Sequence, residues 1–221
     1  MAKLISIISL KSNTGNTTVA LNLGLALHKL GNKVVVIDAD FSRSNIIDHL
    51  NILNPMHTLN SVVNNESYIF DSIIAHDSGL KVVPSIISNS VDNQKVGFYL
   101  NLLSPHNDFV IIDMPKEHEL IDILLKYVDE AFIVHSPEYS SKMIVDASNL
   151  LSKNKVINLG VILNKSPEES VDSFFSNPVI EKIPQHRKII KSFQKKQPLT
   201  YLYPKSDISK KFFRIANRIT H

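Results

Sequence analysis

The chain has 221 residues, of which 43% are hydrophobic and 20% are charged, which is usual for a single globular domain spanning residues 1–221. It has no cysteine, and this excludes disulfides and thiolate metal sites. The net charge of +3 hides an asymmetry: residues 1–181 hold 13 Lys/Arg against 20 Asp/Glu (−7), and residues 182–221 hold 11 Lys/Arg against one acid (+10). An anionic partner near the C-terminal end, or simply a solvated lysine-rich surface, would explain this asymmetry.

The first apolar run, residues 4–9, predicts a buried strand rather than a signal peptide, because no cleavage site of small residues follows it. A helix over residues 17–30 comes next, and Gly31 should end it. The remaining elements are expected in the order strand 33–38, loop with a short helix 51–65, strand 80–84, helix 92–103, strand 108–113, helix 117–127, strand 130–136, helix 138–151, strands 159–164 and 179–183, and helices 187–196 and 206–219.

Most of these strands are continuous apolar runs rich in β-branched residues, as in strands that are buried on both faces. Alternation of strands with helices predicts an α/β fold, with a mostly parallel twisted sheet and helices on both faces. No apolar stretch is long enough to span a bilayer, and we expect a cytoplasmic protein.

The segment between the first strand and the first helix, residues 11–18, lies where a phosphate-binding P-loop belongs. The general pattern G-x-x-x-x-G-K-[ST] is only half met. Gly15 and Thr17 match, whereas Leu10 replaces the first glycine and Asn16 replaces the lysine. Taken alone, such a junction could also be a simple helix cap.

The loop resembles the deviant P-loop of the MinD/ParA family, K-G-G-x-G-K-[ST], whose early signature lysine corresponds to Lys11. Ser12 and Asn13 replace its two glycines. Further family motifs follow in order along the whole chain: the second strand ending in Asp38-Ala39-Asp40, the Walker B strand ending in Asp113-Met114-Pro115, the strand ending in Asn164-Lys165, and Ile183-Pro184. The resemblance implies a P-loop NTPase fold and the cofactors ATP and Mg²⁺.

The resemblance also implies roles for individual residues. Lys11 and Asp40 would be catalytic: Lys11 would reach the phosphates of a partner protomer in a homodimer, and Asp40 would position the attacking water. Thr17, Asp38 and Asp113 would form the metal site. The nucleotide contacts would come from Lys11, Thr14, Gly15, Asn16, Thr17 and Thr18, with Asn164 at the adenine edge. Acids at strand ends can also merely cap turns, and this reading of Asp38, Asp40 and Asp113 stays open.

Among the departures from the family's loop pattern, Asn16 should have the largest effect on activity. Loss of one preorganised donor to the transition state costs about 3–4 kcal/mol, or about 10²–10³ in rate. We therefore expect weak or absent ATP hydrolysis, so whether the chain is an enzyme is uncertain. The chain can still bind nucleotide, because backbone amides and Mg²⁺ provide much of the interaction with the phosphates.

The C-terminal region carries the excess of positive charge. Its last helix, residues 206–219, has an apolar face and predicts packing against the core with a solvated outer face. ParA-type proteins bind DNA non-specifically, and the residues that could do so here are Arg187, Lys188, Lys191, Lys210, Lys211 and Arg214. MinD proteins usually continue into a membrane-targeting tail, and because the sequence ends at His221 we do not expect membrane attachment by that route.

Two functions remain in competition. One is an ATP-dependent dimer switch that positions a cargo such as a plasmid, a chromosome or a cell machine, with an unknown activator or cargo protein as partner. The other is a nucleotide-independent scaffold or DNA-binding regulator. A dinucleotide-dependent oxidoreductase is disfavoured, because no G-x-G-x-x-G follows the first strand.

Overall fold

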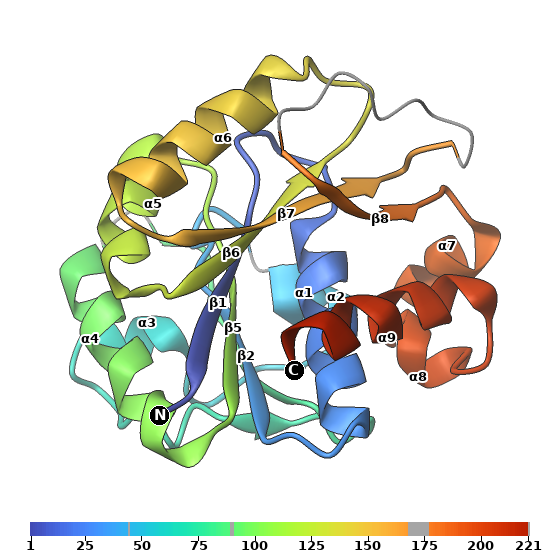
Figure 1. Cartoon of the computed structure of the whole chain (residues 1–221). Coiled ribbons are helices and arrows are strands. Elements are labelled where there is room, and N and C mark those ends of the chain that lie inside the picture. The colour runs from blue at the N-terminus through green and yellow to red at the C-terminus, as the bar shows by residue number, and fades with distance from the viewer. Residues whose placement is uncertain (44, 89–90, 168–176, 221) are drawn as a thin grey trace.

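A computed structural model describes residues 1–43, 45–88, 91–167 and 177–220. Its strands form one sheet in the order β3-β4-β2-β5-β1-β6-β7-β8 (Figure 1). The strands are β1 (Lys3–Ile8), β2 (Val34–Asp38), β3 (Ile74–Ala75), β4 (Lys81–Val83), β5 (Phe109–Asp113), β6 (Glu130–His135), β7 (Ile157–Asn164) and β8 (Val179–Ile183). All neighbours are parallel except β3 and β4, so the predicted mostly parallel sheet is confirmed.

Helices cover both faces of the sheet (Figure 1). They are α1 (Asn16–Lys29), α2 (Asn45–Leu50), α3 (Leu59–Val63), α4 (Asn93–Leu103), α5 (His118–Leu124), α6 (Lys142–Lys153), α7 (Arg187–Gln194), α8 (Leu199–Leu202) and α9 (Asp207–Ile219), with short 3-10 turns after α4 and α5. One apolar core lies between the sheet and α3–α6, and a second lies between the sheet and α1, α2, α8 and α9.

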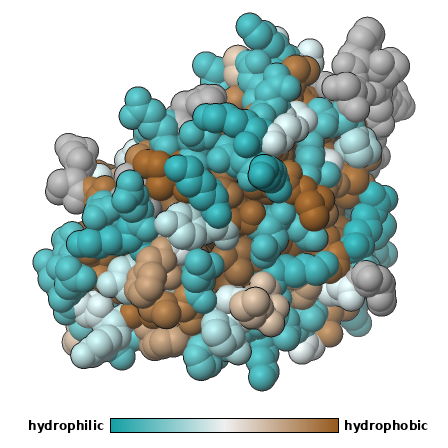
Figure 2. Space-filling model, turned by 60° about the vertical axis from the view of Figure 1, so that its left-hand side comes forward, coloured by the Kyte–Doolittle hydropathy of each residue, from teal (hydrophilic) through white to brown (hydrophobic). Residues whose placement is uncertain are grey.

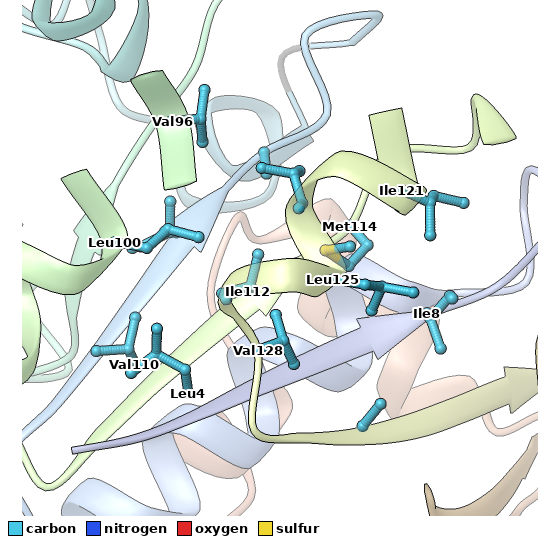
Figure 3. Close-up of a cluster of buried hydrophobic side chains, with 14 of the residues drawn as sticks. Leu4, Ile8, Val96, Leu100, Val110, Ile112, Met114, Ile121, Leu125 and Val128 are labelled. Carbon is cyan, nitrogen blue, oxygen red and sulfur yellow. The ribbon is translucent and has the colours of Figure 1, made fainter. Parts of the chain in front are cut away.

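The central strands contribute alternate side chains to the two cores. In β5, Val110 and Ile112 belong to the first core, and Phe109 and Ile111 belong to the second. Figure 3 shows part of the first core, where Val96 and Leu100 of α4 lie above Val110 of β5. Strands that are buried on both faces read as unbroken apolar runs, and this is why the sequence identified them.

Some element boundaries differ from the prediction. The helix expected over 138–151 begins only at Lys142, because Tyr139 lies in a turn and its hydroxyl donates to the carbonyl of Ser12 at 3.1 Å. Strand β3 was missed, since its two residues contain no pattern of their own and pair antiparallel with β4. Gly31 has φ 93°, a left-handed conformation, and ends α1 as expected.

Within the described ranges, every helix is too short or too polar to cross a membrane. The face that Figure 2 turns forward is mostly hydrophilic, with hydrophobic patches between the polar residues. Exposed aromatic side chains include Tyr68 and Phe98, which are 80% and 57% exposed.

Candidate functional site

The loop between β1 and α1 lies at the carboxyl end of β1, which is flanked by β5 and β6. Asn13 has φ 62° and Gly15 has φ 94°, so both are left-handed. Asn13 stands where the family loop has a glycine, and asparagine tolerates this left-handed conformation better than most residues. A side chain at Gly15 would require Asn164 to move, because a Cβ would lie 2.1 Å from Nδ2 of Asn164.

Thr17 and Asp113 meet directly below this loop. The hydroxyl of Thr17 donates to Oδ2 of Asp113 at 2.5 Å, and Asp113 is fully buried. Within the part of the chain that the structure describes, the other oxygen, Oδ1, has no hydrogen-bond partner. Burial raises the pKa of Asp113 to about 6, although the charge of Lys116 and the bond from Thr17 oppose the shift. A buried carboxylate oxygen without a donor is a position that a bound cation or its water would satisfy.

Asp38 ends β2 and is paired in register with Asp113, and Asp40 follows two residues after the strand. Asp38 accepts backbone N–H bonds from Asp40 and Ile46, both at 3.1 Å. Burial and then the charge of Asp113 raise the pKa of Asp38 well above its usual value. Both carboxylate oxygens of Asp38 therefore stabilise the turn that leads into α2. This is the turn-capping role that the sequence left open as an alternative to metal binding.

Asp40 is buried and is held by the residues that follow it. Its Oδ1 accepts from the hydroxyl of Ser42 at 2.5 Å, and its Oδ2 accepts from the amide of Asn45 at 3.1 Å. Asp40 nevertheless lines the cavity that lies in front of the loop. It combines a turn-capping role with access to that cavity.

The side chain of Asn16 is bonded inside the protein, although Asn16 belongs to the loop that lines the cavity. Its amide donates to the carbonyl of Ile7 at 3.1 Å, and its carbonyl oxygen accepts from the hydroxyl of Thr14 at 3.1 Å. Asn16 is only 3% exposed. Both polar groups of the residue that replaces the family lysine are thus bonded within the protein.

The cavity in front of the loop has a volume of about 110 Å³. It is lined by residues 12–18 of the loop and helix start, and across from them by Asp40, Arg43 and Lys116 among others. The ammonium of Lys116 donates to the carbonyl of Met114 at 2.8 Å. Lys116 and Arg43 were not singled out by the sequence analysis, although Lys116 follows Asp113 by only three positions.

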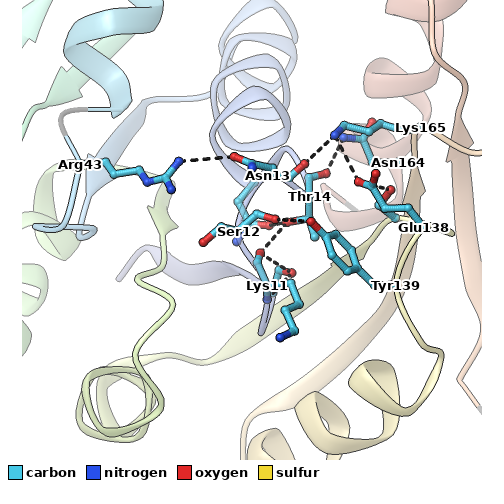
Figure 4. Close-up of polar contacts among 12 residues, drawn as sticks. Lys11, Ser12, Asn13, Thr14, Arg43, Glu138, Tyr139, Asn164 and Lys165 are labelled. Atoms are coloured by element: carbon cyan, nitrogen blue, oxygen red, sulfur yellow. Dashed lines mark hydrogen bonds and ion pairs between the residues drawn. The ribbon is translucent and has the colours of Figure 1, made fainter.

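The outer side of the loop is tied to three other segments (Figure 4). Arg43 donates to the side-chain oxygen of Asn13 at 3.3 Å, and Lys165 donates to the Asn13 carbonyl at 2.7 Å. The amide of Asn164 donates to the carbonyl of Thr14 at 2.7 Å, so it packs against the loop. Lys11 is exposed, and in Figure 4 its side chain points away from the labelled loop residues. The family roles of Asn164 and Lys11 stay predictions.

The basic residues predicted for DNA binding lie on α7 and α9 or beside them. Arg187 and Lys191 are exposed. Lys210 pairs with Asp207 at 2.8 Å, whereas Lys211 and Arg214 pair with Glu181 at 3.4 and 2.8 Å. Lys188 lies over the ring of Tyr203, 5.6 Å from its centroid. These six residues therefore differ: some charged groups are exposed to solvent, and others are already paired within the protein.

Residues 5–199 match the CobQ/CobB/MinD/ParA nucleotide binding domain. The chain belongs to this family. An uncharacterized ATP-binding protein of Methanocaldococcus jannaschii is 30% identical, over 99% of this chain and 88% of that protein. The septum site-determining protein MinD of Synechocystis is also 30% identical, over 99% of this chain and 90% of its own.

Solved structures of MinD proteins share the fold throughout. The cell division ATPase MinD of Pyrococcus furiosus superposes with a TM-score of 0.90 at 27% identity, covering 100% of this chain and 99% of that one. MinD of Pyrococcus horikoshii, complexed with Mg-ADP, gives 0.89 at 26% identity, covering 99% and 96%. The P-loop NTPase fold that the resemblance implied is confirmed.

Proposed function

We propose that the chain binds Mg·ATP in the loop cavity and acts as a slow nucleotide-dependent switch of the MinD/ParA type. The observation that carries the proposal is the pair of Thr17 and Asp113 beside a P-loop with two left-handed residues. One buried oxygen of Asp113 has no hydrogen-bond partner among the described residues. The MinD of Pyrococcus horikoshii was solved with Mg-ADP, which supports the same ligand here.

The residues present fit Mg²⁺. Magnesium prefers oxygen ligands and is usually held by one or two protein groups together with phosphates. The hydroxyl of Thr17 and the free Oδ1 of Asp113 supply such oxygens, and Asp40 lies on the same cavity. When bound, the ion would neutralise charge on the phosphates. The protein's own contribution is the backbone N–H groups of the loop and of the first turn of α1.

Hydrolysis is proposed to be weak. Asn16 brings no charge to the cavity, and its amide is held by the carbonyl of Ile7. Lys11 is exposed, and in the family role it would act only across a dimer. ATP would thus persist for a long time once bound, and the dimer would be a long-lived state that positions a cargo.

The test is isothermal titration of the chain with Mg·ATP and with Mg·ADP. We expect binding that falls by at least about tenfold in Asp113→Ala, because a charged ligand contact is lost. Asp122→Ala is the matched control, since Asp122 bonds Lys153 and Asn154 on the surface and should leave binding unchanged. Absence of binding by the unaltered chain would refute the proposal, and phosphate release at the rate of ordinary MinD proteins would refute slow turnover.

A nucleotide-independent DNA-binding regulator is the second candidate. It is favoured by the exposed basic residues of α7 and by the internal hydrogen bonding of Asn16. Binding of long duplex DNA should fall steeply with salt, and Arg187→Ala with Lys191→Ala should reduce the salt slope by about two. A gel shift in low salt without ATP measures it. No retarded species would remove this candidate.

A further inference from the structure

A polyphosphate in this cavity needs a cation that the loop itself does not provide. The carboxylates of Asp40 and Asp113 lie on the cavity or directly behind it, and both are buried. Asn16 stands where the family has a lysine, yet both ends of its amide are bonded internally. Besides the metal ion, any positive charge that the protein brings to the phosphates in this cavity must therefore come from another segment.

Lys116 is placed to supply this charge. It is half-buried and lines the same cavity as Gly15, Thr17 and Asp40. Among the described residues its ammonium has one acceptor, the carbonyl of Met114, so two of its three N–H groups remain available. It follows Asp113, the aspartate that would hold the metal, by three positions, so a phosphate bound beside that metal would lie within the cavity that Lys116 lines.

We propose that Lys116 is the phosphate-binding cation of this site and replaces, from the segment after β5, the lysine that Asn16 has displaced from the loop. This inference rests on the proposed binding of Mg·ATP. One protomer would then supply both the loop and the positively charged side chain that binds the phosphates.

The other cations near the loop have different positions. Arg43 also lines the cavity, but it is exposed and donates to the side chain of Asn13. Lys165 donates to the Asn13 carbonyl and pairs with Glu138 at 3.4 Å. Lys11 is exposed and does not line the cavity. Of these four, Lys116 is the one that both lines the cavity and follows Asp113 in the chain, and its charge acts on that carboxyl.

The experiment is isothermal titration with Mg²⁺ and a non-hydrolysable ATP analogue, so that turnover does not affect the affinity. Lys116→Ala should weaken binding by about 10–100-fold, the range expected for a lost charge-assisted hydrogen bond. Lys116→Arg keeps the charge and should stay within about threefold. Lys126→Ala is the matched control, because Lys126 is an exposed lysine in the turn after α5 that does not line the cavity and should change nothing.

A second variant tests the replacement directly. In an Asn16→Lys background the loop regains its own lysine, and Lys116→Ala should then cost less than in the unaltered loop, which a double-mutant cycle measures. Equal affinity of the unaltered chain and Lys116→Ala would overturn this inference and leave the proposed function standing. Absence of binding by the unaltered chain would overturn both.

Discussion

The loop region, residues 9–17 with the ends of β2 and β5, and the C-terminal region, residues 179–219, use polar residues in opposite ways. In the loop region most polar side chains, as in Asn16 and Asp38, are buried and bonded to backbone or to each other, although Lys11 and Asn13 are exposed. In the C-terminal region most charges lie outside, apart from the pair of Glu181 and Lys211, and apolar side chains such as Phe212 and Ile215 face the core. The first region therefore depends on individual hydrogen bonds and backbone angles, and the second depends on apolar packing.

The largest effect should come from the apolar face of α9. Phe212 is fully buried in the core shared with α1, and Phe212→Ala should lower the free energy of unfolding by about 3–5 kcal/mol through lost burial and a cavity. Phe193 on α7 is 48% exposed, and Phe193→Ala should cost about 1 kcal/mol. Urea unfolding measures both. Similar losses would mean that the C-terminal region does not depend on this packing.

A comparison of two glycines distinguishes backbone strain from steric crowding. Gly31 follows α1, whereas Gly15 lies in the loop region. Gly31 has φ 93° and open space around its Cβ position, so Gly31→Ala should cost about 1–2 kcal/mol from strain alone. Gly15 has φ 94°, but there a Cβ would displace Asn164 from the carbonyl of Thr14. Gly15→Ala should cost about 1–3 kcal/mol more, since that bond is lost. Equal losses in urea unfolding would show that Asn164 moves aside freely.

The features of the fold that depend on local sequence patterns were predicted from the sequence. The strands were found because unbroken β-branched runs mark burial on both faces, and the acids were brought together because parallel strands end at one edge. The internal hydrogen bonding of Asn16 was not predictable, since it depends on the carbonyl of Ile7 nine positions earlier. Strand β3 was missed because it has only two residues and depends on pairing with β4. The late start of α6 was missed because it depends on the contact of Tyr139 with the distant Ser12.

The smallest effect concerns the ion pairs that join β8 to α9. Burial raises the pKa of Glu181, but the hydrogen bond from Arg214 and the charge of Lys211 outweigh it, and the pKa lies below its usual value of 4.5. A carboxyl whose pKa is lowered by folding adds stability that is present above the unfolded pKa and lost as the pH falls through the folded one. Glu181→Gln should therefore cost about 1 kcal/mol at pH 7.

That difference should shrink as the pH falls below the usual pKa of Glu181, because the unaltered side chain then becomes protonated as well. Urea unfolding of both proteins at neutral and acid pH measures it. Asp207→Asn is the matched control: its partner Lys210 is also on α9, but the carboxyl is fully exposed, so no measurable change is expected. A difference for Glu181→Gln that is independent of pH would show that packing rather than charge joins β8 to α9, and the contrast between the two regions would then be sharper than the ion pairs suggest.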